Sequence, residues 1–79
     1  MKVQEFITEF EEILTVDQGT VKLDSKLKDI DEWDSLAKIA LDVFLEDEFN
    51  IKLDPKTIED FELFSDILNL VKDQLEIDL

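Results

Sequence analysis

Ser35 is the residue of this chain whose neighbours could make it chemically useful. It lies between Asp34 and Leu36, and Lys38 follows three residues later. A serine becomes a strong nucleophile when a base activates it, and the chain contains no His or Cys to serve as base or as an alternative nucleophile. Lys38 lies among carboxylates, so it should keep its proton and be a poor base. We therefore expect no catalysis by the chain itself, and Ser35 is more useful as a residue that another protein modifies.

The carboxylates indicate neither an acid–base pair nor a metal site. They are too many and too evenly distributed to single out two of them. The stretch from Asp29 to Asp34 is dense in acidic residues, but an EF-hand loop counted from Asp29 needs Gly at its sixth position and Glu at its twelfth. Asp34 and Ala40 occupy those positions. The acidic surface is expected to bind divalent ions weakly and without a dedicated site.

The net charge limits the kinds of partner. The 79 residues include 22 Asp and Glu against 8 Lys and Arg, which gives a net charge of −14. Such a surface repels nucleic acid and anionic membranes, whose binding depends on basic residues, and it attracts basic proteins. The same charge would also serve solubility alone. Both readings remain open from composition.

Composition predicts one small folded domain over residues 1–79. The hydrophobic content of 44% is enough for a core. The absence of Cys excludes disulfides and gives no sign of an oxidising compartment. The first residues enter an amphipathic pattern directly, and no apolar run reaches the roughly 20 residues of a membrane span. We expect a soluble, monomeric, cytoplasmic protein.

The hydrophobic pattern predicts helices and no convincing strand. Residues 2–14 carry apolar side chains at helical spacing. These are Val3, Phe6, Ile7, Phe10, Ile13 and Leu14. A long loop is predicted over residues 15–34, with a break at Gly19 and room for a short helical turn. The residues expected to pin it to the core are Val21, Leu23, Leu27, Ile30 and Trp33.

A second helix is predicted over residues 35–49, with Asn50 as its C-terminal cap. One apolar stripe is expected to face the core, widened by three further apolar residues. The stripe is Leu36, Ile39, Ala40 and Val43, and the residues that widen it are Leu41, Phe44 and Leu45. A separate polar stripe places Ser35 on the solvated side. It consists of Ser35, Lys38, Asp42 and Glu46.

Two further helices complete an all-α, small four-helix bundle of three main helices and one short helix. Asp54 and Pro55 suit the N-cap and first position of a short helix that runs to about Phe61, with Ile58 and Phe61 inward. Ser65 is expected to cap the last helix. Its apolar face is Ile67, Leu68, Leu70, Val71 and Leu75.

Local rules alone explain Asp34 and Ser35 as the start of a helix, since both residue types are preferred caps. A helix N-terminus also suits an attached phosphate, because its free N–H groups and its dipole favour negative charge. The local pattern does not decide between these two interpretations.

The wider pattern resembles the acyl carrier protein family. The segments Asp31–Leu41 and Leu45–Phe49 are similar to the centre of such carriers, and the likeness extends over nearly the whole chain. The resemblance implies that a phosphopantetheinyl transferase attaches 4'-phosphopantetheine to Ser35, within a motif that includes Asp34 and Leu36. Acyl or aminoacyl groups would then be carried as thioesters and presented to activating and transfer enzymes. It also implies a docking surface, which we expect at Asp34, Lys38, Asp42, Glu46 and Asp47.

Two positions depart from the pattern of fatty-acid carriers. Those carriers usually have acidic residues two and five positions after the serine, where this chain has Ala37 and Ala40, with Lys38 between them. The departure favours a carrier in a specialised biosynthetic pathway of lipids, polysaccharides, peptides or secondary metabolites. The six Phe residues and Trp33 are expected to fill the core, which favours short or polar cargo held outside it. The alternative is an unmodified acidic helical module that binds basic proteins.

Overall fold

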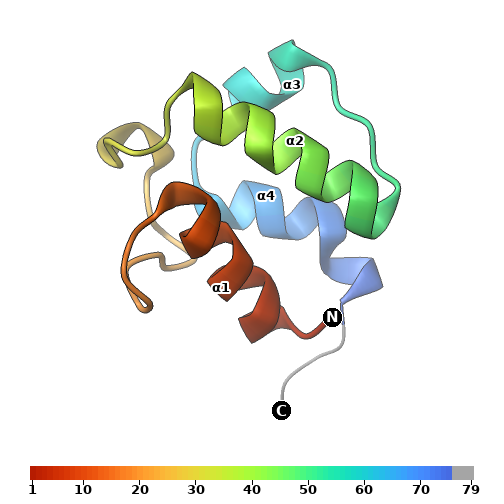
Figure 1. Ribbon diagram of the computed structural model, residues 1–79, viewed down its shortest axis with the longest axis horizontal. Coiled ribbons are helices and arrows are strands. Elements are labelled where there is room, and N and C mark those ends of the chain that lie inside the picture. The colour runs from red at the N-terminus through yellow and green to blue at the C-terminus, as the bar shows by residue number, and fades with distance from the viewer. Residues whose placement is uncertain (76–79) are drawn as a thin grey trace.

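The computed structural model describes residues 1–75, which form four α-helices and two 3₁₀ turns (Figure 1). The elements are α1 (Val3–Leu14), η1 (Leu27–Asp29), α2 (Ser35–Phe49), α3 (Pro55–Asp60), α4 (Phe64–Val71) and η2 (Lys72–Gln74). Lys26 and Leu63 form an isolated β-bridge between the long loop and the residue before α4. The predicted all-α bundle with one short helix is confirmed. No helix in this part of the chain has the length and apolar character needed to cross a membrane.

Helix α1 packs an apolar face against α2 and α4. Phe6 lies at the centre of this packing, with its ring 6.0 Å from Phe44, 5.8 Å from Phe49 and 6.1 Å from Phe64, measured between centroids. Phe10 adds a contact to Phe64 at 4.9 Å. Aromatic pairs at these distances contribute beyond the area that they bury. The rings therefore fill the space between the three main helices, as the sequence predicts, and Figure 1 shows α1 and α2 on either side of α4.

The inward face of α2 matches the predicted one only in part: Leu41 and Leu45, which were expected to widen the stripe, are buried, but most of the stripe itself is not. Its buried residues recur every four positions, and they are Ala37, Leu41, Leu45 and Phe49. The stripe expected inside is instead largely exposed, with Leu36, Ile39 and Val43 at 76%, 61% and 53% of their full accessibility. The reason is the aromatic cluster: Phe6 of α1 contacts two rings of α2 and so turns that side of the helix toward the core.

The segment between α1 and α2 is a packed loop containing one helical turn, as predicted. Val21 and Leu27 are buried, and Trp33 lies 5.7 Å from the ring of Phe10. Leu23 is 53% exposed, so its expected place in the core is wrong. The loop is held by its backbone at this point, because Leu23 O accepts a hydrogen bond from Ser65 N at 3.0 Å.

Helix α3 begins as predicted, and α4 does not. Asp54 caps α3, and its carboxylate accepts the Thr57 N–H at 3.0 Å. Ile58 is buried and Phe61 is half-buried.

Ser65 lies inside α4 and does not cap it. The N-cap is Leu63, and the Asp66 carboxylate accepts the N–H groups of Glu62 and Leu63 at 3.0 Å each. Leu70 is 38% exposed, so it does not belong to the inward face that Ile67, Val71 and Leu75 form.

Candidate functional site

Ser35 is the first residue of α2, and Asp34 prepares that position. The Asp34 carboxylate accepts the Ala37 N–H at 3.0 Å, and its backbone carbonyl accepts the Lys38 N–H at the same distance. Asp34 therefore satisfies one of the donors that every helix start leaves free. The Ser35 side chain is exposed and takes no part in the cap. Its hydroxyl is thus accessible on a backbone that is fixed by its neighbour.

The loop before the serine is anchored to α1. Trp33 packs on Phe10, while the Trp33 N–H is donated to the Ile30 carbonyl at 3.0 Å. The Asp34 N–H is donated to Glu32 O at 2.9 Å. A large half-buried ring directly before the cap fixes where α2 begins. Trp33 therefore helps to fix the position of Ser35 through the backbone between them.

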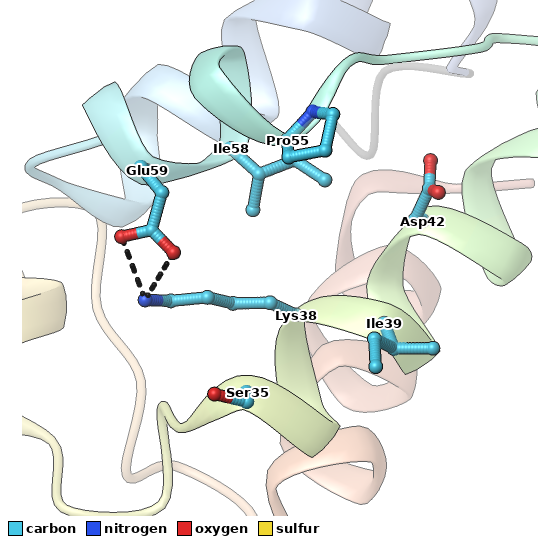
Figure 2. A pocket seen from close by; sticks show the side chains of 7 residues that line it. All are labelled: Ser35, Lys38, Ile39, Asp42, Pro55, Ile58 and Glu59. Carbon is cyan, nitrogen blue, oxygen red and sulfur yellow. Dashed lines mark hydrogen bonds and ion pairs between the residues drawn. The ribbon is translucent and has the colours of Figure 1, made fainter.

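A cavity of about 220 Å³ opens beside Ser35, between the first half of α2 and α3 (Figure 2). Its lining residues come from these two helices. They are Ser35, Lys38, Ile39, Asp42, Pro55, Ile58 and Glu59. That α3 contributes to this site could not be predicted from the sequence. The sequence contains a cation on α2 and acidic residues four and five positions after Pro55, but their proximity depends on how α3 folds back.

Lys38 crosses this cavity and joins the two helices. Its ammonium lies 3.1 Å from both carboxylate oxygens of Glu59. The same nitrogen lies 5.8 Å from the centre of the Trp33 ring, within the range of a cation–π contact. The Lys38 side chain is only 23% exposed, whereas that of Glu59 is 63% exposed.

The other predicted site residues are distributed along α2. Leu36 is exposed at the start of the helix, and Asp42 is half-buried at the cavity. Glu46 and Asp47 are exposed near its end, and Glu46 lies 3.7 Å from the ammonium of Lys52. The structure therefore brings Ser35, Lys38 and Asp42 together at the cavity and leaves Glu46 and Asp47 about three turns from Ser35.

Three apolar residues of α2 that were predicted to face the core form an exposed stripe instead. Leu36, Ile39 and Val43 run along the helix from a position next to Ser35. Ala37 and Ala40 are not part of this stripe. Ala37 is buried, Ala40 is half-buried, and both line a hollow near Leu14 at the end of α1. The sequence of α2 contains more apolar residues than one inward face needs, and this was the signal that could have predicted an exposed apolar stripe.

One comparison decides the family. Over 75 residues the chain is 31% identical to a protein named acyl carrier protein from Phytoplasma mali (strain AT). The aligned residues cover 95% of this chain and 86% of that protein. The chain belongs to the acyl carrier protein family. No family model matches it, and no solved structure matches it. Membership of the family confirms the resemblance seen in the sequence and gives the protein a carrier role.

Proposed function

We propose that this acyl carrier protein carries acyl or aminoacyl groups as thioesters on a phosphopantetheine attached to Ser35. The observation that carries the proposal is the exposed hydroxyl of Ser35 at the first position of α2, with Asp34 as its cap. The residues present fit the group. The hydroxyl lies at a cavity that offers apolar surface from Ile39 and Ile58 and one cation from Lys38.

Attachment requires only that Ser35 be presented to a transferase. Its oxygen would form a bond to the pantetheine-side phosphorus of coenzyme A, the pyrophosphate bond would break, and adenosine bisphosphate would leave. The serine proton would pass to a base of the transferase, since this chain has no His or Cys. When bound, the group supplies the thiol that the chain lacks. The role of the chain is to hold Ser35 exposed and in a fixed orientation.

The proposed docking surface combines the apolar stripe of α2 with the carboxylates beside it. Leu36, Ile39 and Val43 give contact area next to Ser35, while Glu46 and Asp47 attract basic residues of the partner. Electrostatic attraction raises the rate of encounter more than the strength of binding. That combination suits a carrier that several enzymes must bind and release. Asp34 and Asp42 add charge near Ser35, although Asp34 is also needed as a cap.

The proposed pathway is a specialised one rather than the main fatty-acid synthase. Ala37 and Ala40 lack the acidic groups that fatty-acid carriers usually have there, and Lys38 is held by Glu59. The docking face near Ser35 is therefore less acidic than the rest of the protein. The ring-filled core further favours short or polar cargo that stays outside it. Efficient acylation and elongation by a standard fatty-acid system would contradict this part of the proposal.

Intact-mass measurement tests the attachment site. The chain is co-expressed with a broad-specificity phosphopantetheinyl transferase, and we expect a mass increase of one phosphopantetheinyl group. The increase should be lost in Ser35→Ala and retained in Ser25→Ala and Ser65→Ala, the matched controls. An unchanged mass for the wild-type chain would instead support an unmodified acidic interaction module. A second outcome that contradicts the proposal is modification that persists in Ser35→Ala.

A further inference from the structure

Lys38 is held by two contacts close to Ser35. Its ammonium binds both oxygens of Glu59 at 3.1 Å and lies 5.8 Å from the Trp33 ring. Figure 2 shows the Ser35 hydroxyl and this ammonium on the same side of α2, within one cavity. Residues three apart on a helix are neighbours, so a group on Ser35 is within reach of the Lys38 side chain.

The charged residues that line the cavity determine the electrostatic environment of a phosphate attached to Ser35. Among its seven lining residues, Lys38 is the cation, and Asp42 and Glu59 are the anions. A phosphodiester adds one more negative charge beside Ser35. Asp42 and Glu59 then repel the phosphodiester, and among the lining residues only Lys38 attracts it. Ammonium groups bind phosphates well as point charges and carry three donors.

We propose that Lys38 is the phosphate-binding residue of this carrier and that it exchanges Glu59 for the phosphodiester when Ser35 is modified. The inference rests on the proposed attachment at Ser35. Its consequence is that α3, which Glu59 belongs to, loses its ionic tie to α2 in the modified protein. The attached group thereby changes the cavity between these helices as well as adding a thiol.

The exchange is easy for both partners. Glu59 is 63% exposed and can return to water, and exposed ion pairs contribute little to stability. Lys38 is only 23% exposed, and its ammonium is held by Glu59 and by the Trp33 ring. Its long side chain allows the ammonium to move to a neighbouring anion while the stem stays in place. Asp42 is half-buried on the same helix and does not compete for the role, since it repels phosphate.

A double-mutant cycle measured in both forms tests the exchange. Lys38→Met and Glu59→Gln are combined, and unfolding constants are obtained by urea denaturation of the unmodified and modified proteins. In the unmodified protein we expect a coupling of about two- to fivefold in the unfolding constant, typical of exposed pairs. In the modified protein the coupling should vanish. Coupling of equal size in both forms would overturn the inference.

Phosphorus NMR of the modified protein provides the second measurement. The phosphodiester resonance should shift in Lys38→Met and stay in place in Lys56→Met, the control on α3. It should also be unaffected by Glu59→Gln, because Glu59 has already released Lys38. An unshifted resonance in Lys38→Met would overturn the inference while intact mass still confirms attachment. If intact mass shows no group on Ser35, both the inference and the proposed function fail.

Discussion

Glu11 predicts a large and specific loss of stability. It is the charged residue of α1 that the fold buries, at 1% exposure. One carboxylate oxygen accepts the N–H groups of Gly19 at 2.9 Å and Val21 at 3.0 Å. The other oxygen, Oε1, is buried with no partner among the residues that the structure describes. Glu11 thus fixes the beginning of the loop to α1, as Phe10 fixes its end through Trp33.

The size of the loss follows from these contacts. Glu11→Ala leaves the buried Val21 N–H without an acceptor, which costs about 1–3 kcal/mol, and it weakens the contact at Gly19. The lost side chain adds a packing term, so the total is about 2–5 kcal/mol. A chain of this length has an unfolding free energy of about 4–12 kcal/mol. The substitution therefore removes a large share of the stability.

Glu11→Gln separates the hydrogen bonds from the charge. Gln keeps an acceptor for both N–H groups and nearly the same volume, and it removes a charge from the interior. We expect its stability to lie within about 1 kcal/mol of the wild type. Glu12→Ala is the matched control, because Glu12 is exposed on the same helix, and it should change stability by less than about 0.5 kcal/mol.

Urea denaturation of the three variants gives the free energies, and amide hydrogen exchange gives the location. Exchange should accelerate at Gly19 and Val21 in Glu11→Ala, beyond the acceleration caused by the general loss of stability. The reasoning is refuted if Glu11→Ala costs no more than Glu12→Ala, or if exchange at these two amides is unchanged.

Two further predictions concern α2 and α3. Leu41→Ala should lower the free energy of unfolding by about 2–5 kcal/mol because Leu41 is fully buried. Leu36→Ala should lower it by less than about 0.5 kcal/mol because Leu36 is exposed. Thermal melts that rank the two variants the other way would show that the inward face is wrongly assigned. The Thr57 hydroxyl and N–H donate to the Asp54 carboxylate and lower the pKa of that carboxyl below its ordinary value of 3.8. The stability that the ionised Asp54 contributes is therefore present above about pH 4, and it is lost as the pH falls through the lowered pKa of the folded protein. Asp54→Asn should therefore lower the melting temperature at neutral pH and the difference should shrink in acid, with Asp60→Asn as the control; a difference independent of pH would contradict this.

The sequence predicts the ends of the helices better than their orientation. Helix boundaries depend on local chemistry, and the start of α2 after Asp34, its end before Asn50 and the start of α3 at Pro55 are all correct. The start of α4 is the exception. Ser65 is a good cap by type, but Asp66 binds two N–H groups ahead of the helix and places the cap at Leu63. Two suitable capping residues in succession make the local rule ambiguous.

The parts of the site that could not be predicted depend on tertiary contacts. Glu11 lies between Phe10 and Leu14, but the donors to its carboxylate are backbone N–H groups of the loop, which no side-chain pattern reveals. Glu59 likewise meets Lys38 only because α3 folds back beside α2. The place of Ser35 at the start of α2 could be predicted because a helix start is a local feature. Its cavity could not, because two helices are needed to form it.

The two apolar faces of α2 explain why its inward face was predicted wrongly and what the exposed face could serve. A helix that is apolar on more than one side must bury both faces or keep one for a partner. The aromatic cluster buries the face that carries Leu41 and Leu45, which leaves Leu36, Ile39 and Val43 exposed beside Ser35. A second copy of the chain is a poor partner for that stripe, because each copy carries a net charge of −14. The combination therefore favours basic proteins with an apolar contact surface, which is the kind of partner that the proposed carrier requires.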